Sequence, residues 1–359
     1  MSPAIASKIE DLARIDPAQP LADPMAMQTL SLFGREDLIA PVSDSYKPTM
    51  CAPLTPATPP LEEIVRRARL TSIVIVNESH ERSEHRGFTT QIARRLRALG
   101  YDTMAIETLS NPPAGVPERY LPAFLVRPSL PYFEDGDGHY LSEAGFGRLG
   151  RQVKMLGYRL LPYEMTGDGG LPQDASSDQR VAVREEIQAR NLALFIREHP
   201  RAKMLIHVGY SHAGEVPRAD GARWMATRLK QKTGIDPLTI SQTTCRGGSD
   251  TVHLSMLPAK EMAGTFDLVV DHPSARFASG RPDWRKAAGD RLVAIPRELR
   301  PATGWRVIEA RPIGEPDTSV PVDRVAIRPN EEIALMLPPG RYHVRTIDVT
   351  PDRKESSKQ

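Results

Sequence analysis

The sequence of 359 residues is long enough for one large domain and a smaller one. Its composition, with 40% hydrophobic and 26% charged residues, is typical of a globular chain. Its formal net charge of +2 comes from 47 basic and 45 acidic side chains, a balance that gives no basic patch for nucleic acid, so we expect no nucleic-acid partner. No apolar run approaches the length of a membrane span, and the N-terminus lacks the apolar core of a signal peptide. We therefore expect a cytoplasmic protein, or a periplasmic or secreted one if a signal peptide has been removed. The sequence carries no sign of its oligomeric state.

The first 58 residues are rich in proline, which predicts a short helix over 7–14 and otherwise an extended arm. A helix is expected over 60–68, where proline stands near the start and two glutamates lie in the first turn. Cys51 and Cys245 are far apart in the chain, so they can form a disulfide only if the fold brings them together.

From residue 72 onward, runs of β-branched and apolar residues alternate with amphipathic stretches. We expect strands over 72–77, 103–107, 158–164, 203–209, 236–241 and 266–270, and helices over 83–99, 141–156, 175–198 and 219–232. This alternation predicts an α/β fold with an open, mostly parallel sheet flanked by helices. The strands 72–77 and 103–107, joined through one helix, form a βαβ unit and are expected to be parallel neighbours.

Past residue 275 the helical periodicity disappears, and short strands are expected over 305–310, 324–327 and 333–336, followed by a hairpin-like series over 337–344. The segment 110–138 is rich in proline and glycine and predicts a long insertion or lid over the strand ends. The expected organisation is an arm over 1–58, an α/β catalytic domain over 59–275, a small β-rich region over 276–349 and a disordered tail over 350–359.

Polar side chains follow the predicted strands at the points where these strands end. Glu78 and His80 follow the first strand, Glu107 the second, Glu164 the third and His212 the fourth. Because parallel strands end at the same edge of a sheet, we expect one polar pocket there.

Two helical spacings add candidates to this pocket. His80 and Glu84 are four residues apart, so they would share a face if the helix began near His80. Arg184 and Asn191 lie seven residues apart on the long helix and also share a face.

These motifs resemble a superfamily that contains the erythromycin esterases, the ChaN-like haem-uptake lipoproteins and the TraB/Tiki metalloproteases. Residues 78–80 look like the Gly-Glu-x-His that opens the ChaN-like domain, although Asn77 replaces its glycine. His80 and Glu84 are similar to the His-Gly-Thr-Arg-Glu of the esterases, and 104–107 resembles the next strand of both groups, which ends in glutamate. Residues 184–191 resemble the esterases' Arg-Asp-x-x-Met-Ala-x-Asn helix, and 209–212 resembles the Gly-x-x-His of the ChaN and TraB groups. The resemblance covers about 60–275.

Resemblance to the esterases implies hydrolysis of an ester or amide bond in a small molecule or peptide without a metal. His80 would be the general base, Glu78 or Glu107 would orient it, and His212 or Arg184 would stabilise the oxyanion. Glu84 completes the catalytic set that the resemblance implies.

Two alternatives stay open. Resemblance to the Tiki group implies a metallohydrolase, in which Glu78, His80 and His212 would bind a divalent metal such as manganese, cobalt or zinc, with Glu107 behind them. Resemblance to the ChaN group implies a non-catalytic ligand-binding protein, in which Tyr210 would be a candidate axial ligand of haem.

Other polar residues have simpler explanations. His207 alternates within a buried strand, so we expect a core histidine. His85 is either a second ligand or a solvated helix position. Asp168 is expected in a turn, and Asp271 and His272 in a loop, with a place at the rim of the pocket as the alternative.

Overall fold

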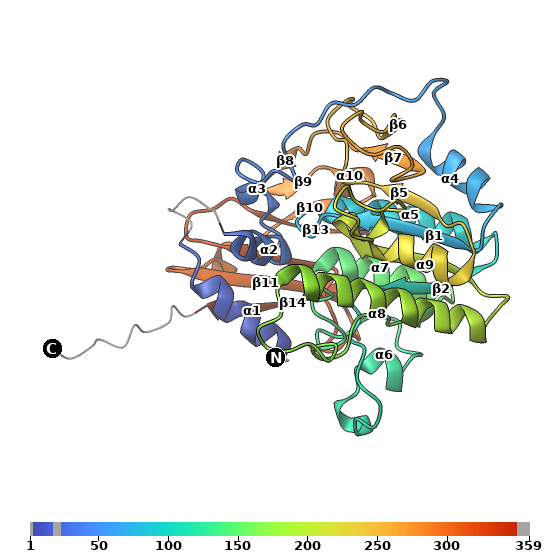
Figure 1. Cartoon of the computed structure of the whole chain (residues 1–359). Helices are drawn as coiled ribbons and strands as arrows, with labels where there is room; N and C mark the ends of the chain where they lie inside the picture. Colours follow the sequence, from blue (N-terminus) through green and yellow to red (C-terminus); the bar gives the residue numbers. More distant parts are fainter. Residues whose placement is uncertain (1–2, 17–22, 350–359) are drawn as a thin grey trace.

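The computed structural model describes residues 3–16 and 23–349, and the tail expected over 350–359 lies outside them (Figure 1). The central element is a mixed sheet with the strand order β3-β2-β4-β1-β5-β7-β6. Its parallel strands are β1 (Ile73–Glu78), β2 (Tyr101–Ile106), β3 (Arg159–Leu161), β4 (Lys203–Gly209), β5 (Leu238–Ser241) and β7 (Leu268–Asp271), and β6 (His253–Ser255) is antiparallel to β7. The predicted α/β class is confirmed.

The predicted neighbourhood of β1 and β2 is wrong, because β4 lies between them. Ile73 of β1 pairs with Met204 of β4, and Met204 also pairs with Thr103 of β2. A helical crossover leaves room for one further strand between the two strands it joins. Residues 204–209 of β4 are all buried, as expected of a strand inside a sheet that is covered on both faces.

Each face of the sheet is covered by its own helices. Val74 and Val76 point to the face covered by α4 (Pro60–Ala68), α5 (Ser83–Arg97) and α7 (Ala144–Met155). Ile73 and Ile75 point to the face covered by α8 (Ser177–Glu198) and α9 (Met225–Thr233). This alternation follows from the two-residue period of a strand, and it explains why β1 is apolar at four consecutive positions. A capping box at Ser176 begins α8.

The extended arm expected before residue 59 is wrong over much of its length. α1 (Pro3–Ala13) overlaps the short helix expected over 7–14, but α2 (Pro24–Leu32) and α3 (Glu36–Ile39) lie where extended chain was expected. Asp23 accepts a hydrogen bond from the backbone N–H of Met25 at 3.0 Å, and Pro24 occupies the first turn, where proline is favourable. Proline was therefore a start signal here rather than a helix breaker.

The N-terminal helices pack on the C-terminal strands rather than on the central sheet. Leu12 and Leu30 share a core with Trp305 and Val307. In Figure 1, α1 and α2 lie beside β11 (Trp305–Pro312) and β14 (Tyr342–Val349). These contacts join the two ends of the chain, and the division into domains at residues 59 and 275 stays a prediction.

The C-terminal part consists of small antiparallel sheets. β11 lies between β12 (Asp323–Ile327) and β14, β10 (Arg291–Ala294) pairs with β13 (Ala334–Leu337), and β8 (Phe277–Ala278) pairs with β9 (Arg281–Pro282). The expected hairpin over 337–344 is wrong, because β13 and β14 belong to different sheets. The remaining elements are η1 (Glu118–Tyr120), α6 (Ala123–Val126), η2 (Tyr210–Ala213), α10 (Trp284–Ala287) and η3 (Arg297–Leu299).

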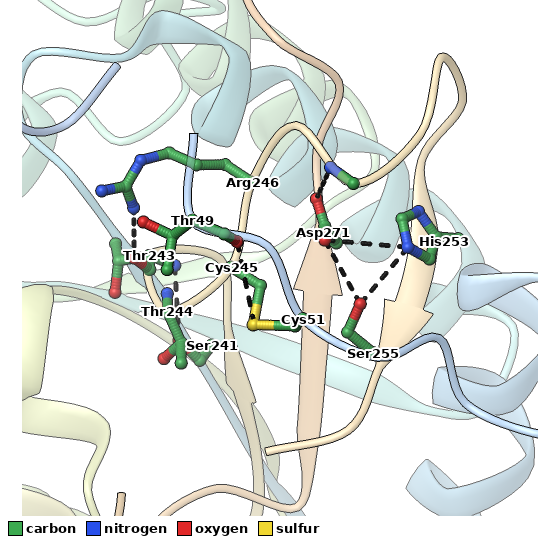
Figure 2. The surroundings of a disulfide bond; sticks show 11 residues. Thr49, Cys51, Ser241, Thr243, Thr244, Cys245, Arg246, His253, Ser255 and Asp271 are labelled. Carbon is green, nitrogen blue, oxygen red and sulfur yellow. Dashed lines mark hydrogen bonds and ion pairs between the residues drawn. A yellow bond between two sulfur atoms is a disulfide. The ribbon is translucent and has the colours of Figure 1, made fainter. Parts of the chain in front are cut away.

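A disulfide joins Cys51 to Cys245, so the fold does bring the two cysteines together (Figure 2). Next to it, Thr49 and Arg246 exchange backbone hydrogen bonds of 2.9 and 3.1 Å. The disulfide thus attaches the segment before α4 to the loop that follows β5. No helix in the described ranges is long and apolar enough to cross a membrane.

Candidate functional site

The carboxyl ends of β1, β2 and β4 carry a cluster of charged side chains, as the strand-end argument predicts. The cluster contains Glu78 at the end of β1, His80 after it, Glu107 after β2, His212 in η2 and Arg184 from α8. These five predicted residues are connected through ion pairs and hydrogen bonds, directly or through one shared neighbour.

Glu78 is the buried anion of this cluster, with 1% of its side chain exposed. Its Oε1 lies 3.0 Å from Nδ1 of His80, and Arg86 contacts both of its oxygens, at 2.9 and 2.8 Å. His207 Nε2 lies 3.3 Å from Oε2. Burial alone would raise the pKa of Glu78, but the nearby Arg86 and His207 outweigh burial and hold this pKa well below 4.5. Glu78 is therefore ionised.

His80 is held in one orientation by its neighbours. Tyr140 stacks on the imidazole at 4.8 Å between ring centroids, and Tyr210 meets it edge-on at 4.9 Å. A methyl group on Gly209 would lie only 2.7 Å from Cε1 and 2.9 Å from Nε2 of His80, so this position needs glycine. The side chain is 14% exposed, and its Nδ1 faces Glu78.

Asn77, which departs from the glycine of the resembled motif, ties the ends of three strands together. Its amide nitrogen donates to the carbonyl of Tyr210 at 2.6 Å and to Thr243 Oγ1 at 3.0 Å. Its oxygen accepts the backbone N–H of Gln242 at 2.7 Å. Tyr210 has a φ of 36°, an unfavourable value for a residue with a Cβ, and the bond from Asn77 supports that turn.

Glu107 contacts His212 and the backbone of Gly209, against which His80 packs. Its Oε2 accepts the backbone N–H of Gly209 at 2.5 Å, and its Oε1 lies 3.5 Å from Nε2 of His212 and contacts Arg184. Burial would raise the pKa of Glu107, yet the charges of His212 and Arg184 outweigh it and lower the pKa below 4.5.

His212 has carboxylates on both sides. Nδ1 contacts Glu185, which is buried, and Nε2 faces Glu107. Burial lowers the pKa of His212, but the hydrogen bond with Glu185 and the charge of Glu107 raise it above 6.5 overall. The imidazole therefore keeps its second proton to a higher pH than an ordinary histidine.

Arg184 is the cation at the edge of the cluster, with 35% of its side chain exposed. Its Nε lies 3.0 Å from both oxygens of Glu164, at the end of the β3 segment, and its Nη1 lies 3.3 Å from Nε2 of His212. Asn191, on the same face of α8, donates to the carbonyl of Tyr163 at 3.0 Å. The predicted shared face of α8 is therefore confirmed.

The predicted partnership of His80 and Glu84 is wrong. Helix α5 begins at Ser83, so His80 lies before the helix and the four-residue spacing does not align the two side chains. Glu84 instead contacts Arg82 and lies 3.6 Å from Nδ1 of His272.

Three further histidine and aspartate predictions can be compared with the structure. His207 is buried in β4 as expected, but it also faces Glu78. His85 is buried and accepts the backbone N–H of Ser79 at 2.9 Å on Nδ1, so the solvated position is wrong. Asp271 ends β7 rather than lying in a loop, and His272 follows it, fully buried.

Arg86 and Glu185 were missed as site residues. Arg86 lies one turn into α5, whereas Glu78 ends β1. Because the two residues belong to different elements, no helical spacing predicts their contact. Glu185 stands directly after Arg184, where the resembled esterase helix has aspartate, and this match was the signal that could have found it.

The residues proposed as metal ligands do not fit that role in this arrangement. Within the described ranges, no group of three histidine, cysteine, aspartate or glutamate side chains is placed to hold a metal ion. Both oxygens of Glu78 already meet Arg86, and Nδ1 of His212 meets Glu185. The Tyr210 hydroxyl, considered for haem, lies 3.5 Å from Ser79 Oγ.

The sequence matches no protein family model and no curated protein. The structure is similar to the type III effector HopBA1, at 14% identity and a TM-score of 0.39 over 65% of this chain and 100% of the effector. It is similar to RRSP, a MARTX toxin effector domain from Vibrio vulnificus CMCP6, at 14% identity and a TM-score of 0.36 over 52% of this chain and 36% of that chain. It is also similar to ChaN of Campylobacter jejuni, known with cofacial haem, at 10% identity and a TM-score of 0.38 over 58% of this chain and 90% of that chain. Membership of the erythromycin esterase or TraB/Tiki groups stays a prediction.

Proposed function

We propose that this protein hydrolyses an ester or amide bond, with His80 as general base and His212 as general acid. The observation that carries the proposal is that two imidazoles at this edge of the sheet each have a different carboxylate at Nδ1, Glu78 for His80 and Glu185 for His212. The substrate is a small molecule or a peptide whose carbonyl group reaches the edge of the sheet.

The contact with Glu78 determines which nitrogen of His80 can act as a base. An ionised carboxylate can only accept hydrogen bonds, so Nδ1 of His80 carries the proton. Nε2 of the neutral ring then has a free lone pair, and it points away from Glu78. This is the tautomer that a histidine needs in order to take a proton from water, and the carboxylate stabilises the imidazolium that forms.

His212 has the opposite role, because it can donate a proton. Glu185 and Glu107 favour its doubly protonated form, so its Nε2 can donate a proton. One group that accepts a proton and another that donates one are the usual arrangement for acid and base in one site.

The reaction follows from these two roles. Nε2 of His80 takes a proton from water as the water oxygen bonds to the substrate carbonyl carbon, and the carbonyl oxygen becomes an oxyanion. The positive charges of Arg184 and His212 stabilise that oxyanion. The bond from carbon to the leaving oxygen or nitrogen then breaks, and the leaving group takes the proton from His212. The products are an acid and an alcohol or amine, and proton transfer from His80 back to His212 through solvent restores both rings.

The test combines a measurement without substrate and one with substrates. In protein labelled with ¹⁵N-histidine, NMR should show the Nδ1–H tautomer for His80, and Glu78→Gln should change the tautomer balance. With a panel of p-nitrophenyl esters and peptide anilides, His80→Gln should lower hydrolysis by about 10²- to 10⁴-fold, the range for loss of a general base.

The matched control is His343→Gln. His343 also faces a carboxylate, with its Nε2 at 3.5 Å from Asp317, but it lies on β14. Its loss should leave hydrolysis unchanged. An Nε2–H tautomer at His80, or full hydrolysis by His80→Gln, would overturn the proposal.

A further inference from the structure

A cavity lies between α5, α7 and α10. Its volume is about 910 Å³, and it is lined by residues of these helices and of the loops 250–252 and 272–276. Sites for small molecules usually measure about 300–1,000 Å³, so this cavity can hold one. Glu84 and His272 form part of its wall, whereas His80 and His212 do not.

One nitrogen of His272 is already bound, and the bond fixes its role. Nε2 of His272 lies 2.9 Å from Oε1 of Gln242. The amide nitrogen of Gln242 donates to the carbonyls of Asn77 at 2.8 Å and of His85 at 3.3 Å. Oε1 must therefore be the acceptor, and Nε2 of His272 carries the hydrogen.

The other nitrogen of His272 is buried and open. Only 1% of the side chain is exposed, and Nδ1 has no hydrogen-bond partner among the described residues. Nδ1 lies 3.6 Å from Oε1 of Glu84, which is too long for a hydrogen bond. When Nε2 of the neutral His272 ring carries the hydrogen, Nδ1 is an acceptor, as is Oε1 of Glu84. One N–H donor placed between these two atoms could therefore bond to both of them. Burying a polar atom without a partner costs about 1–3 kcal/mol, and a bound N–H group would remove that cost.

The charge and the shape of the cavity wall restrict the class of ligand further. Arg82 contacts Oε2 of Glu84, the other oxygen of the carboxylate, and so leaves Oε1 for a ligand. The ring of Trp284 lies on Gly87 of α5, where a methyl group would come within 2.3 Å of it, and its Nε1 donates to Ser83 at 3.2 Å. Phe88 meets His272 edge-on at 5.3 Å. Aromatic walls of this kind favour a flat ring.

We propose that this cavity is a ligand site, separate from the His80 cluster, for a flat aromatic molecule that carries an amino or amidino group. The N–H groups of the ligand bond to Nδ1 of His272 and Oε1 of Glu84, and its ring packs between Trp284 and Phe88. The proposal does not depend on hydrolysis at His80.

The experiment is calorimetric titration of the full chain with benzamidine, a flat ring with an amidino group, and with benzoate, the same ring with a carboxylate. Benzamidine should bind and benzoate should not. Glu84→Gln and His272→Phe should each weaken benzamidine binding at least tenfold, whereas His80→Gln should leave its Kd unchanged. That last variant separates this site from the proposed catalytic one.

A further variant guards against loss of folding. Gln91 is exposed at the cavity wall on α5, so Gln91→Trp should keep the melting temperature and still block the ligand. The proposal is overturned if benzamidine does not bind to the wild type, if benzoate binds equally well, or if the correctly folded Gln91→Trp variant keeps the wild-type Kd.

Discussion

The Nδ1 atom of His80 lies 3.0 Å from Oε1 of Glu78, on a carboxylate that Arg86 contacts at both oxygens. This relationship makes Glu78 both the orienting group of the proposed base and a buried charge on which stability depends. The two roles respond differently to pH and to mutation, and so they can be measured separately.

The stability role of Glu78 should appear as a pH dependence. Its pKa in the folded protein is well below 4.5, because Arg86 and His207 outweigh the effect of burial. A lowered pKa contributes stability above pH 4.5, and this contribution is lost as the pH falls below that value towards the folded pKa. The unfolding free energy of the wild type, measured with urea from pH 7 to 3, should therefore fall more steeply with acid than that of Glu78→Gln. Exposed Glu118→Gln serves as the control and should follow the wild type. Parallel curves for Glu78→Gln and the wild type would contradict this assignment.

Gly209→Ala should disturb His80 without removing any polar group. The new methyl would lie 2.7 Å from Cε1 of the ring, so the imidazole must move away from its present place. A displacement of about 1 Å in a catalytic group can cost about 10²-fold in rate, and we expect hydrolysis to fall by that order. Gly136→Ala is the matched control, since nothing lies within 4 Å of its Cβ position. Equal rates for both variants would show that Nε2 of His80 does not need its present position.

The protonation of His212 should depend on Glu185. Glu185 raises the pKa of His212 above 6.5 against the opposing effect of burial. A raised pKa contributes stability below pH 6.5, and this is lost as the pH rises through the folded pKa. In Glu185→Gln the alkaline limb of the hydrolysis profile should shift to lower pH, because the acid then loses its proton earlier. The neighbouring Glu186 faces Arg228 at 2.8 Å, so Glu186→Gln should keep the wild-type profile. An unshifted limb in Glu185→Gln would exclude His212 as the acid.

Loss of the disulfide should lower stability. Cys51 and Cys245 close a loop with a sequence separation of 194 residues, and disulfides typically contribute about 2–4 kcal/mol by restricting the unfolded chain. Cys51→Ser combined with Cys245→Ser should therefore reduce the urea unfolding free energy by that amount. Dithiothreitol should lower the wild type to the same value and leave the double variant unchanged. A double variant as stable as the oxidised protein would contradict the prediction.

Chelation should leave the protein unchanged. The oxygens of Glu78 meet Arg86, and Nδ1 of His80 and of His212 each face a carboxylate, so these groups are already bound to one another. We expect EDTA to alter neither the melting temperature nor hydrolysis, and mass spectrometry to find equal metal content in the wild type and His80→Gln. Near-stoichiometric metal that disappears in His80→Gln would instead favour the metallohydrolase.

The sequence by itself predicted the strands, the helices and the edge at which polar groups collect. Those features are local: a two-residue or 3.6-residue period and the residues that follow a strand are visible in one segment at a time. Glu78, His80, Glu107 and His212 came together because parallel strands must end at the same edge, and Arg184 reaches them from α8.

Only the tertiary structure decided which groups became partners. It placed β4 between β1 and β2, turned Glu84 towards His272, and brought Arg86 and Glu185 to the two catalytic candidates. It also folded the proline-rich start into helices against β14 and closed the disulfide. Each of these features depends on contacts between segments that are far apart in the chain. The packing of whole faces and the pairing of buried charges determine these contacts, and the periodicity of a single segment does not predict them.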